Sequence, residues 1–261
     1  MEFCSFSSGS SGNSYMVRQG GTVLLVDCGI SGKKIFAGLR ARGAAPEAVS
    51  GILISHEHSD HAKSLRVVVR KTGCSAFMNA GTWACLHDKV PEDRQVMIRC
   101  GERFSVGEVQ VETFALSHDA AEPMGYSFLA GGRKLSIMTD TGYVSDAMLE
   151  AVADADLLVL EANHDVNVLQ MGPYPYALKR RILSEEGHLS NEAAAACILR
   201  LHAMKDKPRR ILLAHLSHQN NTPEMARVTV SNMLEEEGLL TGGSVLLDVV
   251  TRDEISPLYE V

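Results

Sequence analysis

Residues 52–61 run Ile-Leu-Ile-Ser-His-Glu-His-Ser-Asp-His, a short apolar segment that leads directly into three histidines and an aspartate. Imidazole nitrogens and carboxylate oxygens are ligands of zinc, and of manganese where oxygen ligands dominate. His56 and His58 lie two positions apart, so their side chains point the same way if the backbone there is extended. Asp60 and His61 lie beyond them, where a bend would turn them toward a second ion. The stretch therefore predicts a site for two divalent ions, and the alternative is a histidine-rich surface loop without an ion.

Further candidate ligands follow other predicted strands. They are His118 after a strand at 109–114, Asp140 after a strand at 133–139, and His215 after a strand at 210–214. A single histidine after a strand is more often a solvated loop residue. Three candidate ligands that each follow an apolar strand strengthen one another, and the first cluster, as evidence for a metal site. Side chains at strand ends are held by rigid elements, as such a site requires.

The remaining pattern alternates short apolar segments with amphipathic ones. It predicts strands at 14–18, 22–27, 52–54, 109–114, 125–130, 133–139, 157–160, 210–214 and 244–250. It predicts helices at 31–42, 62–72, 174–183 and 190–203, and another that starts at Thr222-Pro-Glu224 with a capping threonine and a proline in the first turn. Two groups of strands separated by helices favour an α+β sandwich of two mixed sheets with helices outside over a doubly wound parallel sheet. We expect residues 1–261 to form a single domain.

The stretch Phe6-Ser-Ser-Gly-Ser-Ser-Gly12 has the composition of an engineered linker. It follows five residues of plausible strand and leads directly into the next predicted strand, so we expect a native loop. Free backbone N–H groups in such a loop can hold an anion. A flexible turn without a ligand is an equally good interpretation.

Composition and charge exclude several classes of protein. The 261 residues are 45% hydrophobic and 22% charged, with 25 Lys+Arg against 32 Asp+Glu and a net charge of −7. Such a chain is apolar enough to fold, and it lacks the basic excess of a polybasic nucleic-acid binder. The six cysteines show no C-x-x-C pair, and neither a secretion signal nor a membrane-spanning segment is present in the sequence. We therefore expect reduced thiols, a cytoplasmic protein and no membrane partner.

Taken together, the candidate ligands and Asp27 in Val-Asp-Cys-Gly resemble the motif set of the metallo-β-lactamase superfamily over essentially the whole chain. The resemblance implies that superfamily's αββα sandwich, with a two-metal site at one edge. It also implies a ligand assignment: one ion held by His56, His58 and His118, the other by Asp60, His61 and His215, and Asp140 bridging them. Asp27 would be a structural residue beneath the site.

The branch of the superfamily is indicated by Asp140 and by three later segments. Antibiotic-degrading members carry a cysteine at the position of Asp140, so this chain does not resemble a true β-lactamase. Glu161-Ala-Asn-His, Gly187-His-Leu-Ser and His215-Leu-Ser resemble motifs of the tRNA 3′-processing endonucleases, whose long exosite arm is not apparent here. The chain is most similar to the YycJ (WalJ) branch, which implies a 5′→3′ exonuclease on double-stranded DNA.

The same resemblance implies a proton relay of Asp60, Glu161 and His188. Asp60 would orient the attacking water, and His188, held by Glu161, would protonate the leaving oxygen, because an imidazole titrates near working pH. His164 is a second candidate for that role, or an outer partner of the site. The cofactors implied are two divalent ions, Zn²⁺ or Mn²⁺.

Candidate substrate contacts are polar loop residues and local basic clusters. A terminal 5′-phosphate would be held by Ser10, Ser11, Asn13, Ser217 and Asn220. DNA phosphates would contact Lys179, Arg180 and Arg181, the group Lys205, Lys207, Arg209 and Arg210, or the helical group Arg66, Arg70 and Lys71. Solvated helix faces and loops are the alternative for these clusters.

Two other functions remain open from the sequence. One is a hydrolase of RNA, or of a small phosphodiester or thioester, on the same site, which would not need the basic clusters. The other is a regulatory protein that keeps the metal for stability, for which Asp60 and His188 would be dispensable. A role in DNA repair is an expectation from the branch alone.

Overall fold

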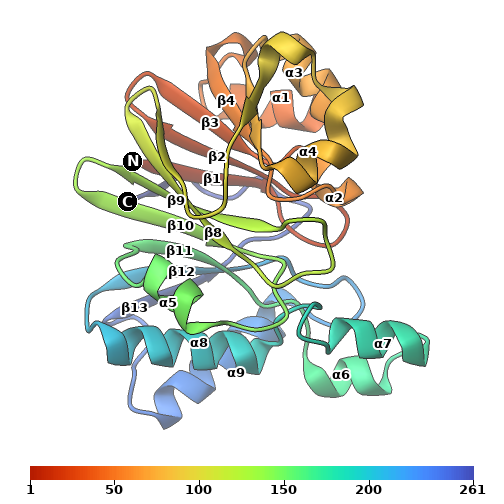
Figure 1. Ribbon diagram of the computed structural model, residues 1–261. Coiled ribbons are helices and arrows are strands. Elements are labelled where there is room, and N and C mark those ends of the chain that lie inside the picture. Colours follow the sequence, from red (N-terminus) through yellow and green to blue (C-terminus); the bar gives the residue numbers. More distant parts are fainter.

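The fold consists of two seven-stranded sheets packed face to face between layers of helices (Figure 1), and the computed structural model describes residues 1–261. The first sheet has the order β14-β1-β2-β3-β4-β5-β6. Its strands are β1 Glu2–Ser7, β2 Ser14–Gln19, β3 Thr22–Val26, β4 Val49–Leu53, β5 Ala76–Met78, β6 Gln95–Met97 and β14 Tyr259–Glu260. Strands β3 to β6 are parallel to one another, and the remaining pairs are antiparallel.

The second sheet has the order β13-β12-β11-β10-β9-β8-β7 and is also mixed. Its strands are β7 Arg103–Val106, β8 Val109–Ala115, β9 Met124–Ala130, β10 Arg133–Met138, β11 Leu157–Glu161, β12 Arg209–Ala214 and β13 Val245–Val249. Strands β10 to β13 are parallel, and β7 to β10 are antiparallel. The α+β sandwich of two mixed sheets predicted from the sequence is therefore confirmed.

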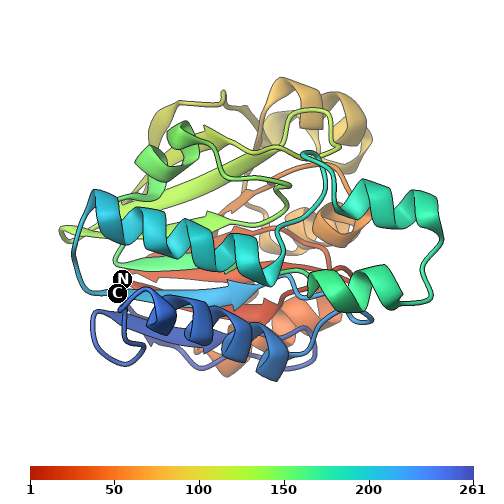
Figure 2. The same ribbon diagram turned by 90° about the horizontal axis from the view of Figure 1, so that it is seen from below.

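Helices cover the outer face of each sheet. They are α1 Gly32–Ala41, α2 Ser59–Ala62, α3 Leu65–Thr72, α4 Ala80–Leu86, α5 Asp146–Val152, α6 Val166–Met171, α7 Tyr176–Ile182, α8 Asn191–Met204 and α9 Pro223–Glu236. Helices α8 and α9 lie side by side across the second sheet, whereas α6 and α7 project beyond its edge (Figure 2). None of the helices combines the length and apolar composition that a bilayer span needs.

Alternation of side chains along the strands produces three hydrophobic layers. In β3, Leu24 and Val26 face the second sheet, whereas Val23 and Leu25 face the layer that contains α1 and α3. In β11, Leu157 and Val159 lie between the sheets, and Leu158 and Leu160 lie against α5, α8 and α9. Both faces of these central strands are buried, which explains their continuous apolar sequences. Burying each such side chain contributes about 1.5–3 kcal/mol.

The predicted elements agree with the structure within a few residues, with three corrections. The strand predicted at 52–54 runs from Val49 to Leu53, and the helix predicted at 62–72 begins at Leu65 after the separate turn of α2. Phe6 and Ser7 belong to β1 instead of the predicted loop. The segments β5 and β6 were missed because three residues are too few to show a period of two. The strand β7 and the short helices α4, α5 and α6 were not predicted either. The C-terminal strand β14 returns to pair with β1, which supports our proposal that residues 1–261 form one domain.

Candidate metal centre

The candidate ligands meet at one edge of the sandwich, the edge on which α2 lies in Figure 1. His56 follows β4 of the first sheet, while Asp140 and His215 follow β10 and β12 of the second sheet. Each of these strands runs parallel to a neighbour, so its carboxyl end lies at the same edge as that neighbour's. The site is therefore assembled from both sheets.

Three strand ends at this edge have an unusual backbone conformation. Asp27, Asp140 and His215 have φ values of 62°, 64° and 57°, and they are the non-glycine residues with positive φ in the chain. A left-handed conformation costs a residue with a side chain on the order of 1–3 kcal/mol. All three residues lie in the same cluster, so the strain is concentrated where the chain aims ligands toward a common centre.

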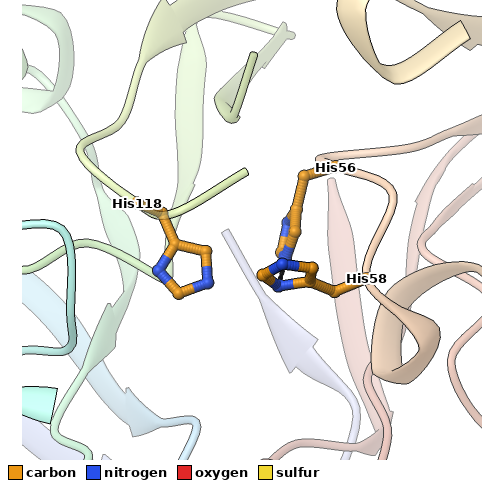
Figure 3. A group of neighbouring side chains, drawn as sticks. All are labelled: His56, His58 and His118. Carbon is orange, nitrogen blue, oxygen red and sulfur yellow. Dashed lines mark hydrogen bonds between the residues drawn. The ribbon is translucent and has the colours of Figure 1, made fainter. Parts of the chain in front are cut away.

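One group of ligands consists of His56, His58 and His118, whose candidate ligand atoms all lie within 4.8 Å of one another. Figure 3 shows the rings of His56 and His58 side by side, with His118 facing them from the opposite wall. His56 Nε2 lies 3.1 Å from His58 Nδ1. Three imidazoles with their nitrogens turned inward form the face of a zinc-type site.

The second group consists of Asp60, His61, Asp140 and His215, again with ligand atoms within 4.8 Å of one another. Asp140 lies 3.3 Å from His61 through Oδ2 and 3.3 Å from His215 through Oδ1. Asp140 Oδ1 is also 3.9 Å from Nε2 of His118 in the first group. The carboxylate that the sequence predicts as a bridge thus lies between the two groups.

Outer partners fix the orientation of the ligand rings. Nδ1 of His61 lies 2.8 Å from Asp27 Oδ2, and Nδ1 of His215 lies 3.0 Å from Glu161 Oε1. Nδ1 of His118 faces the main-chain oxygen of Gly187 at 3.1 Å. With each Nδ1 engaged in this way, Nε2 faces the centre, which is the arrangement of metal-bound histidines.

The residues present fit positively charged ions. Asp140 Oδ2 and His215 Nε2 are buried and have no hydrogen-bond partner, although such an atom costs about 1–3 kcal/mol when left unpaired. Burial opposes a charged His215, but Asp140, Asp60 and Glu161 outweigh it and raise the pKa of this imidazole to about 10. The carboxylates therefore leave an excess of negative charge that a divalent cation can neutralise, and the residues present fit a divalent-metal site.

Glu161 and His188 form a hydrogen-bonded pair beside the second group. His188 Nδ1 lies 2.7 Å from Glu161 Oε1, and Glu161 Oε2 accepts the backbone N–H of Thr141 at 2.9 Å. Burial opposes ionisation of Glu161, but His188 and His215 outweigh it and lower the pKa of this carboxyl to about 2. His188 keeps 18% of its side chain exposed, so it is the member of the pair that a substrate can contact. Asp60 Oδ2 lies 3.5 Å from His61 Nε2 and points into the same space.

His164 is placed differently from His188. Its side chain is buried, it belongs to none of the ligand groups, and neither ring nitrogen has a hydrogen-bond partner. Burial lowers the pKa of this imidazole to about 4. His164 is therefore closed to solvent in this structure, and its role as a second proton donor or an outer partner of the site stays a prediction.

Of the predicted phosphate-binding residues, two are fully buried and two line a hollow beside the metal cluster. Asn13 and Asn220 are fully buried. Asn13 bonds to Gly9 within its own loop, and Asn220 donates to Ser217. Ser10 and Ser217 line a hollow of about 160 Å³ beside His118 and His188. Ser11 is exposed and does not line this hollow.

The predicted basic clusters differ in their distance from the metal cluster and in whether acidic residues pair with them. Lys205, Lys207 and Arg210 pair with Asp154, Asp156 and Asp248, and Arg209 is buried. This group lies at or before the start of β12, whereas His215 follows the end of that strand, so the cluster is remote from the site. Arg66 pairs with Asp88 and Lys71 with Glu47. Only Arg181, on α7, lines the hollow beside the metal cluster.

Two residues that sequence reasoning missed also lie at the site. Asp119 pairs with Arg181, and its Oδ1 is buried without a partner 3.5 Å from His118 Nε2. Its position next to His118 in the sequence was the available signal. Tyr174 also lines the hollow, and it was not predicted as a site residue.

Sequence comparisons give a consistent family. The model of the β-lactamase superfamily domain matches residues 22–216. The chain is 44% identical over 245 residues to exodeoxyribonuclease YycJ of Bacillus anthracis, covering 93% of this chain and 92% of that protein. It is 39% identical over 259 residues to exodeoxyribonuclease WalJ of Streptococcus pneumoniae, covering 97% and 96%.

Solved structures agree on the fold. The metallo-β-lactamase fold protein YhfI from Bacillus subtilis matches with a TM-score of 0.75 at 13% identity, over 100% of both chains. Zn²⁺-bound PqqB from Methylobacterium extorquens matches with a TM-score of 0.75 at 16% identity, also over 100% of both chains. Human tRNase Z, short form, matches with a TM-score of 0.58 at 21% identity, over 84% of this chain and 93% of that chain. At these identities the likeness concerns the fold alone.

Proposed function

This chain belongs to the metallo-β-lactamase superfamily, in the group of YycJ- and WalJ-like proteins, and we propose that it is an exodeoxyribonuclease that removes nucleotides from the 5′ end of double-stranded DNA. It is an enzyme of this hydrolase superfamily. The proposal is carried by the clustering of both histidine groups around Asp140 in a chain that is similar, over nearly its full length, to two proteins named exodeoxyribonucleases. A role in DNA repair is part of the proposal.

Two divalent ions, zinc or manganese, complete this centre in our proposal. His56, His58 and His118 would hold one ion, Asp60, His61 and His215 the other, and Asp140 would contact both. The imidazole-rich first group favours zinc, and the carboxylates of the second group also suit manganese. When bound, the ions supply Lewis acidity to the phosphate and allow a water molecule to attack at neutral pH.

The chain's own residues supply orientation and proton transfer. The Asp60 carboxylate, which points into the centre, accepts a hydrogen bond from the attacking water and turns its lone pair toward phosphorus. His188 has its Nδ1 engaged by Glu161 and lines the hollow. It therefore presents Nε2 to the leaving oxygen and protonates it. Glu161 contacts both His188 and His215, so it holds the proton donor at a fixed position relative to the metal ligands.

The test is digestion of 5′-phosphorylated duplex DNA labelled at either end, with protein loaded with zinc or with manganese. We expect stepwise loss from the 5′ end. Asp140→Ala, purified and checked for folding by circular dichroism, is the control that removes the shared carboxylate. Digestion that persists in this variant, or a folded and metal-replete wild-type protein that cleaves no DNA, would refute the proposal.

A small phosphodiester is the second candidate substrate. The net charge of −7 and the acid partners of the basic residues before β12 favour it, because a long polyanion gains little from side chains that are already paired. Turnover of bis(4-nitrophenyl) phosphate without turnover of DNA or RNA would identify this alternative.

A further inference from the structure

The hollow beside the metal cluster is lined by three groups of residues. His118 and His188 come from the metal cluster, and Ser10 and Ser217 are hydroxyl residues of neighbouring loops. The third group comes from α7 and the residue Tyr174 before it. The volume of about 160 Å³ is roughly half of the smallest pockets that hold drug-sized ligands, about 300 Å³. A hollow of this size matches a single nucleotide unit better than a longer segment of strand.

The third group is one face of a short helix. Leu178, Arg181 and Ile182 follow helical spacing and all line the hollow, together with Tyr174 just before the helix. The chain after α7 is packed tightly against its neighbours, because a Cβ on Gly187 would lie 2.2 Å from the main-chain oxygen of Ile182. This face of α7 is therefore held in place at its C-terminal end.

The polar groups of the hollow are free to bind a ligand. Ser217 Oγ accepts hydrogen bonds from the backbone and side-chain amides of Asn220, so its own proton remains available. Asp119 engages Arg181 only through Nε, which leaves the two terminal nitrogens of the guanidinium for a phosphate. An aromatic ring, a cation and a hydroxyl around one small space match the base, phosphate and sugar of a nucleotide.

We propose that this hollow binds the single terminal nucleotide of the strand being degraded, with its base against Tyr174 and its 5′-phosphate at Arg181, and that its small size restricts cleavage to the first phosphodiester. This inference rests on the proposed exonuclease function and extends it to a residue-level end pocket. Because His188 borders the hollow, the leaving oxygen belongs to the nucleotide inside it.

The bond changes follow from this placement. Phosphorus gains a bond to the water oxygen and loses its bond to the 3′ oxygen of the terminal nucleotide. The electron pair stays on that oxygen, His188 gives it a proton, and the proton lost by the water passes to solvent. The products are a mononucleotide with a 3′-hydroxyl and a strand shortened by one residue with a 5′-phosphate, as the proposed 5′→3′ polarity requires.

The experiment compares pocket variants with a matched variant on the outer face of α7. Tyr174→Ala removes the proposed stacking ring, and Leu178→Trp fills the hollow. Tyr176→Ala is the control, since this exposed residue packs against Arg180 and does not line the hollow. The readouts are binding of deoxyadenosine 5′-monophosphate by calorimetry, the ratio of DNA to bis(4-nitrophenyl) phosphate turnover, and the length of the first product. A thermal melt of each variant reports folding.

We expect Tyr174→Ala to weaken mononucleotide binding by roughly 5- to 150-fold, the usual range for one stacked base, and both pocket variants to lower the turnover ratio at least about tenfold. The Tyr176→Ala control leaves both readouts unchanged, the first product is a mononucleotide, and a hairpin-capped duplex resists cleavage. Equal behaviour of pocket and control variants, or oligonucleotides as first products, would overturn the end pocket while leaving nuclease activity standing. If wild-type protein cleaves no DNA, the proposed function fails, and the mononucleotide arm still decides whether the hollow binds a nucleotide.

Discussion

Substitution of Glu161 by glutamine should separate the role of its charge from that of its shape. Glu161 is fully buried and accepts four hydrogen bonds, two from the imidazoles of His188 and His215 and two from the backbone amides of Thr141 and Leu189. A glutamine has one acceptor oxygen, so in either orientation its NH₂ group faces two donors. Two lost hydrogen bonds to a charged acceptor, at about 1.5–3 kcal/mol each, give a loss of roughly 3–6 kcal/mol. That is a large share of a typical stability of about 5–15 kcal/mol.

The assay is denaturant unfolding of the metal-loaded protein, paired with turnover of 5′-phosphorylated duplex DNA, whose alkoxide leaving group needs a proton. We expect a lower midpoint at an unchanged slope, together with a roughly 10²- to 10⁴-fold loss of DNA turnover, because the proton donor is no longer held in place. Glu185→Gln, an exposed carboxyl in the loop after α7, is the matched control and should alter neither quantity. A stability loss below about 1 kcal/mol with full turnover would refute the assignment of Glu161 as the residue that positions His188.

Three further predictions follow from the same geometry. Gly29→Ala should lower stability by more than about 3 kcal/mol or prevent folding, because its Cβ would lie 1.5 Å from a main-chain oxygen of the metal-ligand loop. Gly21→Ala, whose nearest contact is a flexible side chain at 3.8 Å, is its control in the same thermal melt. Chelation with EDTA should lower the melting temperature, since an ion at 100 times its Kd contributes about 2.7 kcal/mol, and an unchanged melt would contradict the metal site. At pH 8 the native protein should react with Ellman's reagent rapidly at the exposed Cys85 and Cys100 and only slowly at Cys197. Burial raises the pKa of the Cys197 thiol to about 12 and keeps it protonated. Six equally fast thiols would show that the buried ones are accessible.

Local sequence was sufficient for the elements whose pattern is long. The apolar segment at 157–160 became the central strand β11, and Thr222 caps α9 by accepting a hydrogen bond from the backbone N–H of Met225, as its position before Pro223 predicted. Where a segment has only three residues, as in β5 and β6, periodicity carries no information, and neighbouring strands decide the conformation. The basic run that includes Lys205 and Arg210 was equally ambiguous, because charge in a sequence does not show whether an acid lies opposite.

The candidate ligands themselves were determined by the sequence, because histidines and aspartates after apolar segments have few structural uses and mark a metal site wherever the strands end. Only the tertiary structure decided which of them meet. His118 reaches His56 and His58 from the other sheet, and Asp27 holds His61 across 34 positions of chain. The hollow that Tyr174 and His188 both line likewise exists only in the folded chain. The physical reason is that a ligand's type is a property of one side chain, whereas a site is a set of distances, and those distances are set by the packing of two sheets whose contacts no local pattern encodes.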